Sequence, residues 1–158
     1  MQIDTPPEAK PRSPGKAIRG LYFEDLTVGR RATAMRTVME TDLNDFADVS
    51  GDKNPIHLCE DFASGTRFGQ RIAHGMFTAS LISALIGTTL PGPGAIYLSQ
   101  SLQFLGPMRI GDVVTVVVEV VELVPARRRA RLHCECVVDG RAVLEGEAWV
   151  AVPSRDRP

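Results

Sequence analysis

The chain has 158 residues, of which 44% are hydrophobic and 23% are charged, and its formal net charge is -1. This length and composition fit one globular domain that is large enough to bury a real core. The near-neutral charge gives no sign of a nucleic-acid-binding surface, so we expect no nucleic-acid partner.

The two ends of the chain differ in composition from its middle. The first 20 residues hold four prolines among charged side chains and contain no apolar run that could form the core of a signal peptide. We therefore predict a disordered Pro-rich leader over residues 1–20, one domain over residues 21–153 and a polar tail over residues 154–158.

Neither a membrane span nor a disulfide framework is predicted. The longest apolar stretch, residues 76–90, is interrupted by serines and threonines and is too short to cross a bilayer. The three cysteines, Cys59, Cys134 and Cys136, are too few and too awkwardly spaced for a disulfide scaffold. We expect a reducing, cytoplasmic location and no membrane partner.

Two short helices are predicted in the first half of the chain. Residues 31–40 have weak strand character, after which Thr41 is expected to cap a helix that Gly51 ends. A second helix should begin with Asn54 as its N-cap and Pro55 at the first helical position.

A longer helix is predicted to start near His74. It follows a Gly- and Arg-rich loop and stops at the Pro-Gly-Pro-Gly segment of residues 91–94. Its sequence is apolar almost all round, so we expect other structure to surround it.

The remainder of the chain has the pattern of strands. Apolar residues alternate over residues 96–104, residues 113–124 are mostly β-branched, and residues 130–138 and 142–150 each show an alternating apolar face. Strands that follow one buried helix indicate an α+β domain, with an antiparallel sheet of about five strands wrapped around that helix.

The turn between the last two strands has two possible lengths. A two-residue Asp139-Gly140 turn would pair Val138 with Arg141, whereas a three-residue turn would pair Val138 with Ala142. The longer turn keeps the apolar faces of both strands together, so we predict three residues.

Asp52 and His57 form a candidate acid–base pair in one short loop. Gly51 frees the backbone before Asp52, Pro55 stiffens the connection, and Asn54 can hydrogen-bond within the loop. If Pro55 starts a helix, its positive end would favour the neutral imidazole of His57, which can accept a proton. The alternative is an aspartate that caps a turn beside a polar loop histidine.

Gly75 supplies a candidate site for developing negative charge. It has no side chain, so a substrate oxygen could reach the backbone N–H groups at the start of the long helix, where the helix dipole also attracts an anion. The alternative is a plain tight turn.

Three motifs in this order resemble the MaoC-like, (R)-specific enoyl-CoA hydratases. They are Ser-Gly-Asp-x-Asn-Pro-Ile-His at residues 50–57, Ala-His-Gly-Met at residues 73–76, and Leu-Pro-Gly-x-Gly-x-Ile-Tyr-Leu-x-Gln-Ser-Leu-x-Phe at residues 90–104. The resemblance extends from about residue 22 to residue 152. It implies a hot-dog fold and a homodimer whose sheets abut and whose substrate tunnels lie near the interface.

The resemblance also implies roles for particular residues. The catalytic pair of the family falls on Asp52 and His57, its oxyanion-hole amide on Gly75, its helix serine near the active site on Ser83, and its structural asparagine on Asn54. The implied hydro-lyase reaction is reversible syn addition of water to trans-2-enoyl-CoA, which gives the (R)-3-hydroxyacyl-CoA. No cofactor and no metal is expected, because the CoA thioester is itself the substrate.

Cys59 departs from the family pattern. Many members carry an acidic residue two positions after the histidine, and here Glu60 and Asp61 are close but differently spaced. We expect Cys59 to be a small buried residue; otherwise the hydrogen bonding of the loop would be altered.

The sequence also leaves alternatives to a hydratase. The closest is dehydration of 3-hydroxyacyl groups on acyl carrier protein. Thioesterases of this fold commonly use a carboxylate on or beside the central helix, but no Asp or Glu occurs from residue 62 to residue 111. A non-catalytic acyl-CoA-binding module would not need an intact Asp52–His57 pair. A metal site built from His57, Cys59, Asp61 and His74 would lack any recognised ligand spacing.

Overall fold

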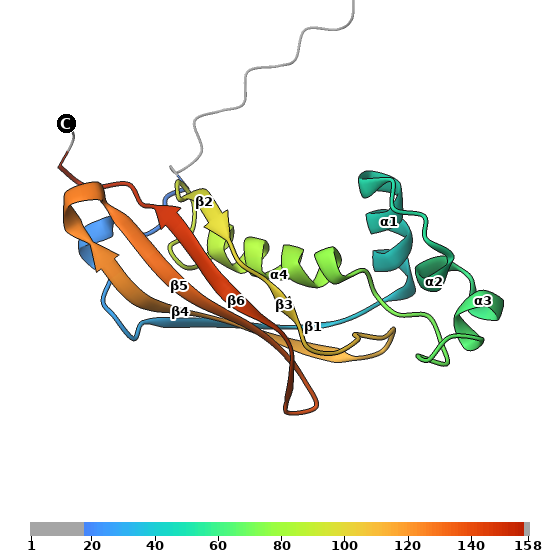
Figure 1. The fold of residues 1–158 in the computed structure, drawn as a ribbon. Helices are drawn as coiled ribbons and strands as arrows, with labels where there is room; N and C mark the ends of the chain where they lie inside the picture. Colours follow the sequence, from blue (N-terminus) through green and yellow to red (C-terminus); the bar gives the residue numbers. More distant parts are fainter. Residues whose placement is uncertain (1–17, 157–158) are drawn as a thin grey trace, which may run out of the picture.

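The structure is a computed structural model that describes residues 18–156. Most of the predicted leader (residues 1–17) and the end of the predicted tail (residues 157 and 158) lie outside this range. One curved sheet packs along one long helix, and three short helices lie beyond the N-terminal end of that helix (Figure 1). Among these residues, no helix is long and apolar enough to cross a membrane.

Within the described range, one strand precedes four α-helices and five strands follow them, which is an α+β order. The elements are β1 (Arg31–Thr37), α1 (Glu40–Ser50), α2 (Pro55–Leu58), α3 (Glu60–Ser64), α4 (Gly75–Thr88), β2 (Ile96–Gln100), β3 (Gln103–Phe104), β4 (Val113–Val124), β5 (Arg129–Val138) and β6 (Arg141–Ala151), with short 3-10 turns η1 (Phe23–Asp25) and η2 (Pro125–Arg127).

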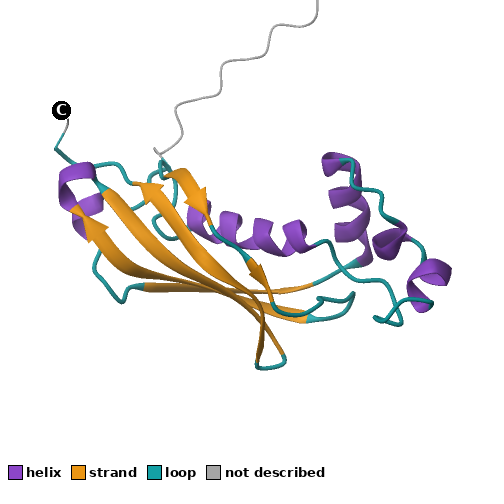
Figure 2. Ribbon diagram, viewed as in Figure 1, coloured by secondary structure: helices purple, strands orange, loops and turns teal. Residues whose placement is uncertain are grey.

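The sheet is antiparallel and has the strand order β1-β4-β5-β6-β2, with β3 also paired to β6. Figure 2 shows the strands curving beside α4. This confirms the predicted α+β arrangement of a sheet wrapped around a central helix. The sheet has six strands rather than about five, because the predicted strand over residues 96–104 divides into β2 and β3.

The segment between β2 and β3 passes very close to Gly146 of β6, and this close approach accounts for the division. A Cβ atom at Gly146 would lie only 1.9 Å from the carbonyl oxygen of Ser101, so a side chain does not fit there. The close approach is held by hydrogen bonds from Ser101 N–H to the Glu147 carbonyl (2.9 Å) and from Glu147 N–H to Ser101 Oγ (3.0 Å). The chain then continues into β3, which carries Phe104 toward the start of α4.

The core lies between the sheet and one face of α4. β4 and β5 alternate between buried and more exposed residues, and Cys134 and Cys136 lie on the buried face, as predicted. The buried face of α4 consists of Phe77, Thr78, Leu81, Ile82, Leu85 and Ile86. Burial of this apolar area is the main stabilising contribution to the fold.

The other face of α4 is uncovered in the single chain. The expectation that other structure surrounds this helix is therefore wrong for one chain, because the sheet covers only one side of it. The exposed helix residues are Met76, Ser80, Ser83, Ala84, Gly87 and Thr88.

The predicted three-residue turn between β5 and β6 is also wrong. Val138 pairs with Arg141 across a two-residue turn in which Asp139 and Gly140 have φ angles of 48° and 73°, as a type I′ turn requires. A register shift next to Cys136 then restores the predicted pairing, since Cys136 lies opposite Leu144. The apolar faces meet as expected, but a bulge rather than the turn accommodates the extra residue.

The boundaries of α1 and α2 follow local capping signals, with one difference from the prediction. Met39, not Thr41, occupies the N-cap of α1, because the Asp42 carboxylate accepts a hydrogen bond from the Met39 N–H (2.8 Å). Gly51 ends α1 with φ 78°, and Asn54 caps α2, both as predicted.

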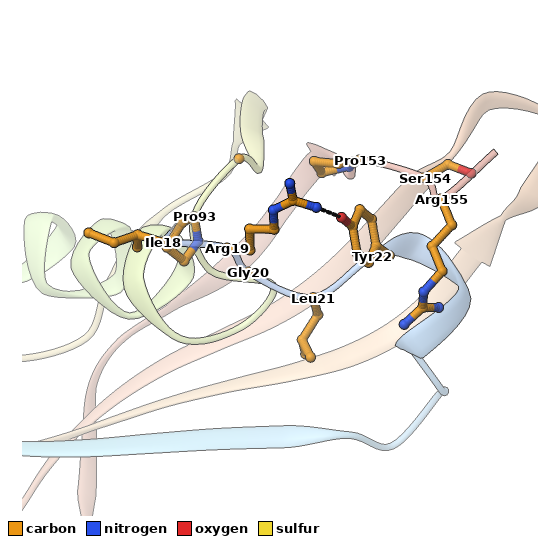
Figure 3. Close-up of a pocket in the computed structure, with 10 residues that line it drawn as sticks. Ile18, Arg19, Gly20, Leu21, Tyr22, Pro93, Pro153, Ser154 and Arg155 are labelled. Atoms are coloured by element: carbon orange, nitrogen blue, oxygen red, sulfur yellow. Dashed lines mark hydrogen bonds between the residues drawn. The ribbon is translucent and has the colours of Figure 1, made fainter. Parts of the chain in front are cut away.

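The two ends of the described chain meet at the far end of α4 from Gly75. A pocket of about 430 Å³ lies there, lined by residues 18–22, Pro93, Gly94 and residues 153–155. Figure 3 shows these lining residues. The polar groups of the pocket satisfy one another: Arg19 donates to the Tyr22 hydroxyl (2.7 Å), and Arg155 pairs with Asp25 (2.6 Å). We interpret this pocket as the junction between the chain ends, remote from the Asp52–His57 loop.

Candidate active site

A series of side chain–backbone hydrogen bonds shapes the loop that carries Asp52. The Asp52 N–H donates to Ser50 Oγ, the Asn54 N–H donates to Asp52 Oδ1, and the Ile56 N–H donates to Asn54 Oδ1, each at 3.2 Å. Because the Asn54 N–H binds Asp52 and its side chain caps α2, Asn54 fixes the loop between the two candidate catalytic residues.

His57 is buried in α2 and has a defined tautomer. Its Nδ1 lies 2.8 Å from the Ile72 carbonyl, which can only accept a hydrogen bond, so Nδ1 carries the proton and Nε2 has a free lone pair. Burial lowers the pKa of His57, and proximity to His74 acts in the same direction, while the Ile72 carbonyl and the Asp52 carboxylate oppose the shift. The imidazole is therefore favoured in its neutral form, as expected, although burial rather than the helix end is the main cause.

Asp52 and His57 are close enough to share one water molecule. A carboxylate oxygen of exposed Asp52 and a ring nitrogen of buried His57 lie within 4.8 Å of each other. Two hydrogen bonds of ordinary length that meet at one water oxygen span about 4.5 Å. The loop therefore offers a carboxylate and a neutral imidazole to a single small nucleophile.

Gly75 lies on the same pocket as His57. It is the first residue of α4, and its N–H donates no hydrogen bond to any residue that the structure describes. The pocket measures about 420 Å³ and is also lined by Thr78 and Phe104. A Cβ atom at position 75 would lie 2.8 Å from Phe104 Cε1, so a side chain there would displace the Phe104 ring. The arrangement suits a carbonyl oxygen placed against the positive end of a 14-residue helix.

Arg67 is the only permanently charged side chain that lines this pocket, and it is exposed. Its guanidinium lies 4.8 Å from the centroid of the Phe68 ring and makes no ion pair with a residue in the range 18–156. Arg71 differs, because it binds Glu40 at 2.8 Å and Glu60 at 3.1 Å. Arg67 is thus open to an anionic ligand, whereas Arg71 connects α1 to α3.

Two residues from the sequence prediction lie away from this pocket. Ser83 is on the exposed face of α4, about 12 Å along the helix axis from Gly75, and its supporting role stays a prediction. Cys59 is exposed at the junction of α2 and α3, so the expectation of a buried residue is wrong. The Ile72 carbonyl holds His57, and no contact from Cys59 is needed to orient the ring.

His74 is the residue whose importance the sequence did not reveal. It is only 1% exposed, and its ring stacks on that of His57 with centroids 3.8 Å apart and planes 29° apart. The Ala-His-Gly-Met motif was a signal for this position, but it predicted the helix start rather than the stacked pair.

Asp52, His57 and His74 are also the one acid–histidine cluster of metal-binding size among residues 18–156. Each histidine already has one ring nitrogen at a backbone carbonyl, so each could offer an ion only its other nitrogen.

The chain is similar to known proteins over most of its length. The family model described as "MaoC like domain" matches residues 25–138. A 3-hydroxybutyryl-CoA dehydratase of Methylorubrum extorquens is 57% identical over 139 residues, which cover 88% of each chain. An (R)-specific enoyl-CoA hydratase of Rhodospirillum rubrum is 52% identical over 85% of this chain and 93% of its own.

Solved structures agree as well. An unliganded R-hydratase of Pseudomonas aeruginosa matches with a TM-score of 0.82 and 43% identity, over 86% of this chain and 88% of that one. An (R)-hydratase of Aeromonas caviae matches with a TM-score of 0.80 and 41% identity, over 82% and 99%. The chain therefore belongs to the MaoC-like family and has its hot-dog fold.

Proposed function

We propose that this protein is a hydro-lyase that adds water reversibly to trans-2-enoyl-CoA and gives (R)-3-hydroxyacyl-CoA. One observation carries the proposal: a carboxylate and a neutral imidazole within 4.8 Å of each other lie beside a pocket that ends at the open helix terminus of Gly75. The relatives named for this reaction, at 42% to 57% identity, support it.

The proposed mechanism divides the work among three groups. Asp52 and His57 orient one water molecule, and His57 Nε2 accepts a proton as the water oxygen bonds to the β-carbon. The Gly75 N–H stabilises the enolate-like oxygen that forms when the double-bond electrons move toward the thioester. This proton then passes from His57 to the α-carbon. Because donor and nucleophile lie on one side of the substrate, the addition is syn, and dehydration is the same path reversed.

This chemistry is redox-neutral and moves only protons and one hydroxyl group. Side chains and one backbone amide supply every role in it, so we propose that no cofactor and no metal takes part.

Coenzyme A is the proposed carrier of the acyl group. The relatives named as CoA enzymes are 42% to 57% identical, whereas those named as acyl-carrier-protein dehydratases are 31% and 33% identical. Exposed Arg67 lines the pocket and supplies a cation for a phosphate, a group that both CoA and the phosphopantetheine arm of acyl carrier protein carry. A thioesterase is disfavoured, because α4 carries no acidic residue.

We propose that the chain acts as a homodimer and resides in the cytoplasm. β2 is an edge strand with Ile96, Tyr97 and Leu98 exposed, and the uncovered face of α4 lies within the same domain. A second copy could cover both surfaces. Sedimentation at micromolar concentration should give twice the chain mass of 17.2 kDa, and a monomer at that concentration would contradict the dimer.

Replacement of either acid–base residue should abolish hydration without loss of the fold. We expect Asp52→Asn and His57→Ala each to lower the rate with crotonyl-CoA by at least about 100-fold, because proton transfer at the shared water is lost. Loss of the absorbance of the conjugated thioester measures the rate. Cys59→Ser, which changes an exposed residue outside the pocket, is the control and should remain near wild type.

Two results would count against this mechanism. Unchanged turnover in both Asp52→Asn and His57→Ala would remove the proposed acid–base pair. Release of free thiol at a rate comparable to the absorbance change would instead favour a thioesterase.

The pH dependence should reflect the lowered pKa of His57. Since burial favours the neutral imidazole, kcat/KM for crotonyl-CoA should still exceed half its maximum at pH 6.5 and reach half only at a lower pH. Protonation of this group at low pH also favours the unfolded state, so each sample is returned to pH 7.5 and assayed again. If kcat/KM falls to half its maximum at or above pH 6.5, and activity recovers fully at pH 7.5, the pKa of His57 is not lowered.

Arg67 should matter only for substrates that carry phosphate. Arg67→Gln should raise KM for crotonyl-CoA about tenfold, as loss of a charge-assisted hydrogen bond predicts, and leave KM for crotonyl-pantetheine unchanged. Arg127→Gln, in η2 and outside this pocket, is the matched control. An equal rise of KM for both thioesters would show that Arg67 does not bind phosphate.

A further inference from the structure

His74 connects three parts of the site. It is the N-cap of α4, immediately before Gly75. Its ring packs between Phe46 (centroids 5.1 Å apart) and His57 (3.8 Å), and its Nε2 lies 2.9 Å from the backbone carbonyl of Asp52. One buried side chain therefore joins the helix terminus, the imidazole and the carboxylate-bearing loop.

The hydrogen bond to Asp52 fixes the tautomer of His74. A carbonyl oxygen only accepts, so Nε2 donates and carries the proton. Nδ1 is buried and has no hydrogen-bond partner among the residues that the structure describes. This ring thus has a donor engaged with Asp52 and an acceptor that faces no donor.

His74 does not line the pocket that His57 and Gly75 share. It is also only 1% exposed, so substrate has little access to its ring. Its contacts are instead with the residues that do the chemistry, 17 and 22 positions away in the sequence.

We propose that His74 is a positioning residue whose Nε2–H holds the main chain of Asp52, so that the carboxylate stays beside Nε2 of His57. This role deepens the proposed hydration and rests on it. Asp52 is exposed, and its other backbone constraint, the bond from its N–H to Ser50 Oγ, is long at 3.2 Å. The bond from His74 is shorter and comes from a buried ring, so it is the stronger constraint on the loop.

Two variants separate the hydrogen bond from the stacked ring. His74→Gln keeps an N–H donor at about the position of Nε2 but removes the ring, whereas His74→Phe keeps a flat ring against His57 but removes the donor. We expect His74→Phe to lower kcat for crotonyl-CoA about 100-fold with little change in KM, because the carboxylate is misplaced. His74→Gln should stay within about fivefold of wild type in kcat, since the loop remains held.

A second measurement does not depend on activity. In ¹H–¹⁵N spectra, the amide of Lys53 follows the Asp52 carbonyl along the chain and reports on the hydrogen bond to that carbonyl. Its ¹⁵N shift should change in His74→Phe and stay near the wild-type value in His74→Gln. Circular dichroism checks that both variants fold.

The outcomes are distinct. Equal loss of kcat in both folded variants, or an unchanged Lys53 shift in His74→Phe, would overturn the positioning role. A wild-type protein without hydratase activity would refute the proposed function, and the amide shifts would still decide whether His74 holds Asp52.

Discussion

The hydrogen bond from His57 Nδ1 to the Ile72 carbonyl is the contact on which the site depends. The Ile72 N–H in turn donates to the Ile56 carbonyl at 3.3 Å, so α2 and the segment before α4 bind each other in both directions. The next residue, Ala73, donates its N–H to the Met108 carbonyl at 2.7 Å. The imidazole is therefore oriented by backbone groups that are themselves bound to the rest of the domain. The same contact places the proton on Nδ1 and leaves Nε2 as the acceptor.

The proposed site combines a buried histidine with an exposed carboxylate, and the two environments suit different proposed roles. Burial of His57 favours the neutral ring that can accept a proton, while the exposed carboxylate of Asp52 keeps contact with solvent. Water can then approach from the open side, where Asp52 lies, and meet the Nε2 lone pair. A site in which both groups were buried would incur a large desolvation penalty for the carboxylate without a cation nearby.

Local signals in the sequence predicted much of this arrangement. Gly51 and the Asn54-Pro55 pair marked the ends of two helices, and the alternation in residues 130–138 predicted the buried face of β5; both were confirmed. The turn length was wrong because alternation reports which residues share a face, and a bulge next to Cys136 preserves the faces equally well. Periodicity cannot say where along a strand the extra residue enters.

Features that depend on contacts between distant residues could not be predicted from local sequence patterns. The stacking of His57 on His74 joins residues 17 positions apart, and the exposure of Cys59 follows from the break between α2 and α3. Neither is encoded in a local pattern, because each depends on how the short helices pack against the start of α4.

The uncovered face of α4 has a consequence for substrate selection. Ser83 lies on this face, about 12 Å along the helix from the amide that would bind the thioester carbonyl. An acyl chain that extends away from Gly75 along this face would meet no wall from its own chain there, so a second copy would have to supply one. In the proposed dimer, the acyl-chain length that the enzyme accepts is then set jointly by the exposed residues of α4 and by the partner.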